Sequence, residues 1–428
     1  YLDALDRTER TIDVAAQVPH HPLRVYVMGE RAIRRAPATA DDIDQMRRFT
    51  AEALKAGAFG FTTSRTDQHK TTSGELVPGR YAEERELSGI GRALGDVGAG
   101  VFGMLSDFDD EKGEFAWITQ MTQEMGRPFW FLLTDRSYDP QRWRRLMDGV
   151  RQARAAGSNV VAQVAGRPVG VILGLTTSLT PFAARPSFAA LSKLPVPERL
   201  ERLRDPALRA KILAEQPSEE LLAIMPPLQR PIATRWERQY VLGDPPDYEP
   251  DESRSIAAMA AKTNLTPEEF CYDYLTGGNG ERMLFYPITN YVFGDHGVVH
   301  EMITDKDTVL GLSDGGAHCG LICDSSLPSY MLTHWVRDRA RGPRIGLEFA
   351  VKRLTSETAD FFGFRDRGRL APGMKADVNV VDLDALRLHH PEMRYDRPAG
   401  GKRLVQRVDG YTATIVSGVP IFERGEDT

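Results

Sequence analysis

The sequence predicts an α/β fold in which parallel strands alternate with helices, and three observations predict it. Short apolar runs rich in strand-forming residues recur along the first part of the chain, each followed by a polar turn. After each turn comes a segment whose apolar residues have helical spacing. The composition, 41% hydrophobic and 27% charged over 428 residues, supplies a large core. Five such units in a row suit a barrel better than a short open sheet, although their spacing alone leaves both open.

The apolar runs predict five strands, at residues 23–28, 58–63, 100–105, 128–133 and 159–164. The helices between them are predicted at residues 41–56, 82–94, 115–125 and 140–156. The first helix has the clearest ends. Thr39, with Asp42 three residues later, resembles a capping box, and Gly57 is well placed to end the helix.

The alternation of strands and helices stops after the fifth unit. Residues 176–251 are rich in proline and charge, with one predicted helix at 197–215, and we interpret them as an insertion over one face of the barrel. The alternation of strands and helices resumes later in the chain. Helices are predicted at 267–275, 297–303 and 347–362, and a strand at 308–312. Residues 377–382 and 412–416 are predicted strands of a small separate sheet. These patterns divide the chain into a barrel domain at 1–370 and a small β-sandwich at 371–428.

Composition excludes several classes of partner. The formal net charge is −6 and no basic tract is present, so nucleic acid is not expected to bind. No apolar run approaches the roughly 18 residues that cross a bilayer, so no membrane segment is predicted. Three cysteines without a CxxC pair are too few for a disulfide framework, which indicates a cytoplasmic protein. Because the chain starts at Tyr1 and not at Met, we expect its natural N-terminus to lie further upstream.

The strongest local motif is Leu-Ser-Asp-Gly-Gly-Ala-His at residues 312–318. It places the carboxylate of Asp314 at the end of a predicted strand, and the two following glycines let the chain turn away sharply. A carboxylate at such a position can bind a metal ion and take a proton from a metal-bound water. The alternative is a simple turn, since Asp-Gly is among the commonest turn dipeptides.

Several segments together resemble a known family. The run Gly-Arg-Leu-Ala-Pro-Gly at 368–373 and the strand after it resemble the closing segment of the amidohydrolase superfamily. Four further segments resemble the D-aminoacylase group within it, the N-acyl-D-amino-acid deacylases. They are Tyr-Leu-Asp-Ala-Leu at 1–5, His-His-Pro-Leu-Arg at 20–24, Ala-Gly-Ala-Phe-Gly-Phe-Thr-Thr-Ser at 56–64 and Val-Pro-Gly-Arg-Tyr at 77–81.

The resemblance implies a (β/α)₈ TIM-like barrel, present here from about its third strand, with a small C-terminal β-sandwich. It implies a hydrolase that uses a divalent metal, with zinc expected, to deacylate N-acyl-D-amino acids or related small molecules. Asp314 takes the role of metal-facing acid and base, and His318 matches a histidine that follows it in the family. His318 could contact substrate or metal, or it could be a loop histidine that bonds the backbone. The family's His-x-His ligands would lie ahead of Tyr1. Where the family has ligand histidines on strands five and six, this chain has Asp107 and Asp135, which could be oxygen ligands or could cap helices.

Other polar residues are weaker candidates. Arg65 or Arg167 could receive a substrate carboxylate through a bidentate pair, or form an ordinary salt bridge. His20 could face the mouth of the barrel and contact substrate, and His69 lies in a loop after a predicted strand at the same mouth. The four-residue spacing of His296 and His300 suits a metal, but without a supporting glutamate motif we interpret them as helix-surface histidines.

Three alternative functions remain open from the sequence. The first is hydrolysis of another C–N bond, such as that of a cyclic imide or ureide, by the same machinery. The second is a catalytically degenerate relative that binds a ligand. The absence of the ligand histidines of strands five and six favours this alternative. The third is an unrelated α/β protein whose Asp-Gly-Gly is only a turn. The sequence does not fix the oligomeric state, and a homo-oligomer is possible.

Overall fold

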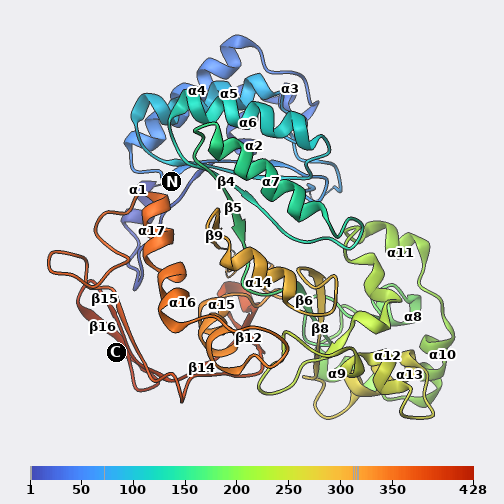
Figure 1. Cartoon of the computed structure of the whole chain (residues 1–428). Coiled ribbons are helices and arrows are strands. Elements are labelled where there is room, and N and C mark those ends of the chain that lie inside the picture. The colour runs from blue at the N-terminus through green and yellow to red at the C-terminus, as the bar shows by residue number, and fades with distance from the viewer. Residues whose placement is uncertain (1, 72, 312, 314, 316–317) are drawn as a thin grey trace.

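A six-stranded parallel sheet is the centre of the fold (Figure 1). The computed structural model describes residues 2–71, 73–311, 313, 315 and 318–428. The strand order is β1-β2-β3-β4-β5-β9, so neighbours in the sheet are also successive along the chain except for the step from β5 to β9. These strands are β1 (Val18–Pro19), β2 (Gly60–Arg65), β3 (Val101–Ser106), β4 (Phe129–Leu132), β5 (Val160–Val164) and β9 (Thr308–Leu310). The parallel α/β arrangement is confirmed, while closure into a barrel stays a prediction.

Helices between the strands form one layer over the sheet (Figure 1). They are α4 (Ala40–Lys55), α5 (Glu84–Val97), α6 (Glu111–Met125) and α7 (Arg142–Ala155), close to the predicted bounds. The predicted capping box is confirmed, because Thr39 accepts from the backbone of Asp42 and the Asp42 side chain accepts from Thr39. In the core, Phe61, Phe102 and Phe129 stand on adjacent strands with ring centroids 5.1 and 5.2 Å apart.

The predicted strand at 23–28 is wrong. Only Val18–Pro19 pairs in the sheet, and the next residues form helix α2 (His20–Met28). His20 and Arg24 lie one turn apart on this helix, and both are buried against the Glu86 carboxylate. The apolar residues at 23–28 fit a helical period as well as strand alternation. The contacts of His20 and Arg24 with Glu86 stabilise the helix. Pro22 falls in the first helical turn, where proline is tolerated.

The segment between β5 and β9 forms a second unit with its own core. Its antiparallel sheet, in the order β6-β8-β7, is built from β6 (Val169–Gly174), β8 (Met283–Thr289) and β7 (Tyr240–Val241), none of which was predicted. The helix predicted at 197–215 is two helices, α9 (Val196–Leu203) and α10 (Pro206–Ala214), since Asp205 caps a new helix at Pro206. The other helices are α8 (Pro186–Ala189), α11 (Glu219–Ile224), η1 (Arg230–Ala233), η2 (Trp236–Arg238), η3 (Glu252–Arg254), α12 (Ile256–Ala260) and α13 (Pro267–Thr276). The insertion proposed at 176–251 lies within this unit.

The chain on either side of β9, up to the start of the C-terminal sheets, is mainly helical (Figure 1). The helix predicted at 347–362 is broken at Thr355, whose φ of −123° and ψ of −87° are not helical. The predicted strand at 308–312 ends at Leu310, and Leu312 lies outside the described residues. The helices of this part and at the N-terminus are α1 (Leu2–Asp6), α3 (Glu30–Ile33), α14 (Gly297–Thr304), α15 (Leu327–Tyr330), the π-helix η4 (Met331–Asp338), α16 (Leu347–Leu354) and α17 (Ser356–Phe362).

The C-terminal residues form antiparallel sheets. The orders are β10-β15-β16-β17, β11-β14 and β12-β13, which agree with a separate β unit. Their elements are β10 (Val378–Val381), β11 (Arg387–Leu388), β12 (Glu392–Arg397), η5 (Pro398–Gly400), β13 (Gly401–Val405), β14 (Val408–Asp409), β15 (Tyr411–Val416), β16 (Val419–Glu423) and β17 (Glu426–Asp427). In the described part of the chain, no helix has both the length and the apolar character needed to cross a bilayer.

Candidate active site

The carboxyl ends of the six parallel strands meet at one edge of the sheet, where α/β enzymes bind their ligands. The residues predicted for the site follow these ends: His20 after β1, Arg65 at the end of β2, Asp107 after β3, Asp135 after β4 and Arg167 after β5. Asp314, which follows β9, lies outside the described residues. Its described neighbour Ser313 donates a hydrogen bond to the Asp324 carbonyl at 2.8 Å.

His20 is buried and both of its ring nitrogens have protein partners. Nδ1 lies 2.8 Å from Thr63 Oγ1, and Nε2 lies 2.9 Å from Glu86 Oε1. The Arg24 guanidinium donates to the same Glu86 oxygen at 2.8 Å. This network anchors the start of α2 at the end of β1. Substrate contact by His20, which stays a prediction, would require the ring to give up one of these partners.

His69 lies in the loop after β2, and His318 acts on it electrostatically. Ser64 Oγ lies 2.6 Å from His69 Nδ1. Burial lowers the pKa of His69, and the neighbouring charge of His318 lowers it further, while Asp107 acts in the opposite direction. His318 is exposed, and its φ of +53° shows that the chain turns sharply here. Sequence reasoning placed His69 at the mouth, but it did not pair this residue with Ser64 or His318.

The two aspartates that replace the family's strand-end histidines do not cap the following helices. Asp110 caps α6, and Gln141 occupies the N-cap of α7. Asp107 instead accepts from Thr66 and from the Asp67 backbone, both at 2.8 Å, and from Arg136. Burial would raise the pKa of Asp107, but these hydrogen bonds outweigh burial and lower it. Helix capping is therefore wrong for both residues, and Asp107 is an ionised carboxylate at the strand ends.

Asp135 ties the end of β4 to the loop after β8. Its backbone N–H donates to Asn290 Oδ1 at 3.0 Å, and its Oδ2 accepts from the Val292 N–H at 3.3 Å. Its Oδ1 is buried without a hydrogen-bond partner among the described residues. Burial raises the pKa of Asp135. The residue thus holds the β8 loop over the strand ends.

Arg65 and Arg167, the two residues predicted to bind a substrate carboxylate, each pair with a carboxylate of the protein. Arg65 donates to Glu114 Oε1 at 2.9 Å and to the Ala82 carbonyl at 2.6 Å. Arg167 is fully buried, pairs with Asp324 and lies 4.1 Å above the ring of Tyr248. A substrate carboxylate would compete with these partners, and its capture by Arg65 or Arg167 stays a prediction.

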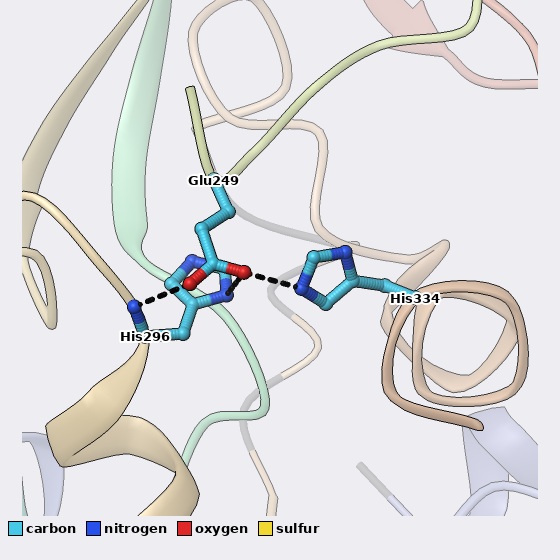
Figure 2. Close-up of side chains that lie close together, drawn as sticks. All are labelled: Glu249, His296 and His334. Carbon is cyan, nitrogen blue, oxygen red and sulfur yellow. Dashed lines mark hydrogen bonds and ion pairs between the residues drawn. The ribbon is translucent and has the colours of Figure 1, made fainter. Parts of the chain in front are cut away.

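Figure 2 shows a buried cluster of Glu249, His296 and His334. It lies near the residues that follow β5, because Trp335, which stacks on His296, donates to the Gly166 carbonyl. Among the described residues it is the one group of three whose ligand atoms lie within 4.8 Å of one another. Glu249 Oε2 lies 2.9 Å from His334 Nε2 and 3.6 Å from His296 Nδ1. His296 Nε2 lies 3.0 Å from the Tyr248 carbonyl, so Nε2 carries the proton and Nδ1 presents a lone pair. Glu249 lies in the proline-rich run that gave no periodic signal, so sequence reasoning missed it.

Charge and hydrogen bonding argue against a resident metal in this cluster. Arg339 donates to both Glu249 oxygens at 3.1 Å, and the His296 backbone N–H donates to Oε1 at 2.8 Å. With His334, the carboxylate therefore has four donors, which is all that its lone pairs accept. Burial would raise the pKa of Glu249, but His334 and Arg339 lower it far below its usual range. The three ligand atoms have the spacing for a metal, but in this arrangement Arg339 supplies the balancing positive charge.

Comparisons with known proteins identify relatives of the whole chain. The sequence matches the amidohydrolase family over residues 1–422. An uncharacterized protein of Mycobacterium tuberculosis is 25% identical over 464 residues, covering 100% of this chain and 70% of that protein. The N-acyl-D-glutamate deacylase of Alcaligenes xylosoxydans xylosoxydans is 26% identical over 391 residues, covering 90% of this chain and 64% of the deacylase. A D-aminoacylase crystal structure aligns with a TM-score of 0.56 at 20% identity, covering 100% of this chain and 72% of that one, which supports a shared fold.

Proposed function

The chain belongs to the amidohydrolase family, and from that premise we propose that it is a metal-dependent hydrolase of amide bonds in N-acylated amino acids. N-acyl-D-amino acids are the proposed substrates, since one relative is an N-acyl-D-glutamate deacylase and another is a D-aminoacylase. The proposal includes a (β/α)₈ barrel, to which the six parallel strands contribute, and a cytoplasmic location.

We propose that Asp314, together with other ligands, would hold a divalent metal such as zinc, which would supply Lewis-acid activation of the amide carbonyl and of a water molecule. The described residues at the strand ends do not by themselves gather three metal ligands, so the metal-binding role falls on Asp314 together with others. Asp314 accepts the water proton and returns it to the leaving nitrogen. We propose that His318 donates a hydrogen bond to the substrate, which its exposure and its electrostatic effect on His69 support.

One observation supports the location of this chemistry most strongly. His318 and Asp107 both act electrostatically on His69, although the three residues come from separate parts of the chain. They follow β2, β3 and β9 in the chain, and the carboxyl ends of these strands form the edge at which barrel enzymes place their catalytic groups.

The proposal is tested by substrate hydrolysis with the purified product of the whole gene. We expect metal-dependent release of free amino acid from N-acetyl-D-amino acids, which Asp314→Asn reduces by at least about a hundredfold, as general acid–base catalysis contributes about 10² to 10⁴. Asp305→Asn, at the opposite end of β9, is the matched control and should retain activity. An Asp314→Asn variant with unchanged activity would contradict the assignment.

A catalytically degenerate binding protein is the second candidate. It is favoured by Asp107, which stands where the family has a ligand histidine and whose oxygens already accept from Thr66, Asp67 and Arg136. The same assay decides between the two, because a degenerate relative would bind N-acyl compounds without releasing any product. Cyclic imides and ureides belong in the same substrate panel, since the alternative hydrolase would turn over these compounds only.

A further inference from the structure

A groove of about 1060 Å³ lies between the unit that follows β5 and the β12–β13 hairpin. Thr176 and Arg199 line one side of it, and Lys402 and Tyr395 line the other. Arg199 stands on α9, which belongs to the unit inserted between β5 and β9, while Lys402 stands on β13. Two cationic side chains from distant parts of the sequence therefore face one groove.

Neither cation has a carboxylate partner among the described residues. Lys402 Nζ donates to the Thr176 carbonyl at 2.9 Å, and Arg199 donates to the Leu175 and Ser192 carbonyls. Glu201 and Glu281 also line the groove, but neither forms an ion pair with Arg199 or Lys402. This contrasts with Arg65 and Arg167, whose positive charges are balanced by Glu114 and Asp324.

Donors in the groove also lack acceptors. Within the described part of the chain, Arg199 Nε is buried without a hydrogen-bond partner, and so is the hydroxyl of Thr176, a residue that is 8% exposed. Buried polar groups are seldom left without partners, because losing water without a replacement costs free energy. Burial lowers the pKa of Lys402, and the like charge of Arg199 lowers it further. An anion between the two cations would satisfy these donors and relieve the repulsion.

The groove adjoins the loop that carries the proposed acid and base. The Leu404 N–H of β13 donates to the Cys319 carbonyl at 2.6 Å. A Cβ added to Gly320 would lie 3.3 Å from Lys402 Cε and would overlap Ser178 Oγ. The hairpin is thus fixed against residues 319–320, just after His318. Lys402 therefore reaches the groove from a hairpin that packs on residues one and two positions after His318 in the chain.

We propose that Arg199 and Lys402 bind a carboxylate of the substrate remote from the scissile amide, such as the side-chain carboxylate of an N-acylated acidic amino acid. This inference rests on the proposed amide hydrolase activity. Asp314 and His318 keep their proposed roles, and substrate selection falls to the contact between the inserted unit and the C-terminal hairpin. Charge-assisted hydrogen bonds from two partly buried cations would favour an acidic substrate over its neutral isostere.

The test compares N-acetyl-D-glutamate with N-acetyl-D-glutamine, which differ only in the remote carboxylate. We expect Arg199→Gln and Lys402→Gln each to raise KM for the glutamate compound by about tenfold to a hundredfold, as for loss of a charged hydrogen bond. The KM for the glutamine compound and kcat for both should change little. Arg199→Lys, which keeps the charge, should recover part of the loss. Arg209→Gln, which removes an arginine paired with Asp273 outside the groove, is the control.

Equal effects of Arg199→Gln and Lys402→Gln on both compounds, or no effect on either, would overturn the proposal. If the protein hydrolyses neither compound, the proposed activity fails and binding still tests the groove. Calorimetric titration with glutarate should then show binding to wild type and to Arg209→Gln, and much weaker binding to Lys402→Gln. Glutarate binding that is equal in all three proteins, or absent from wild type, would refute the groove independently of catalysis.

Discussion

Glu249→Gln should destabilise the protein more than any other single loss of charge described here. The substitution keeps the size of the side chain but removes the negative charge that faces Arg339, whose side chain is 1% exposed. Arg339 donates to both carboxylate oxygens at 3.1 Å, so the substitution leaves a buried guanidinium without a counter-charge. Breaking one partner of a buried pair costs about 3–5 kcal/mol. His334 also loses a charged acceptor at 2.9 Å, which places the loss toward the upper end of that range.

Urea unfolding measures this loss directly. Glu252→Gln, three residues away in an exposed position, should change the free energy of unfolding by less than about 0.5 kcal/mol. The double variant Glu249→Gln with Arg339→Met should recover part of the stability, because it no longer buries an unpaired charge. A Glu249→Gln protein within about 1 kcal/mol of wild type would refute the interpretation of the cluster as a buried ion-pair network.

Two further predictions concern pH and packing. Burial lowers the pKa of His21 to about 4 and that of His296 to about 3, so between pH 6.5 and about 4 the unfolded chain binds more protons than the folded one. The free energy of unfolding should therefore fall as the pH falls through this window, by up to about 1.4 kcal/mol per pH unit for each histidine, and His21→Gln should flatten the urea-measured slope. A slope unchanged in His21→Gln would contradict this assignment. Gly103→Ala should lower the melting temperature, because its Cβ would overlap the Trp130 ring and overpacking costs about 1–3 kcal/mol, whereas an unchanged melting temperature would show that the ring moves freely.

The repeated strand–helix units were predictable because local signals agree with the tertiary structure there. The α4 helix has an apolar face, with Met46 and Leu54 buried, and a complete capping box, so periodicity and end signals agree. The strands at 101–106 and 160–164 are largely buried on both faces, and most of their residues are apolar.

Where the sequence misled, long-range contacts decided the structure. The start of α2 is fixed by Glu86, which lies 66 residues beyond His20. Strands β6 and β8 pair with each other although more than a hundred residues separate them, so no local turn in the sequence indicates this pairing. The same holds for the sites, because the partners of Arg65, Arg167 and Glu249 cannot be read from spacing. The Asp-Gly-Gly motif was identified from sequence, while the groove of Arg199 and Lys402 required the structure.

The metal content of the whole-gene product, measured by elemental analysis before and after Asp314→Asn, tests the central claim most directly. We expect about one or more divalent ions per wild-type chain, substantially fewer in Asp314→Asn, and an unchanged content in the control Asp305→Asn. We also expect that removing Glu249 leaves the metal content unchanged, because Arg339 occupies that cluster. A wild-type protein that takes up no zinc, manganese or cobalt on reconstitution would contradict a metal-dependent hydrolase, and so would a content that Asp314→Asn does not alter.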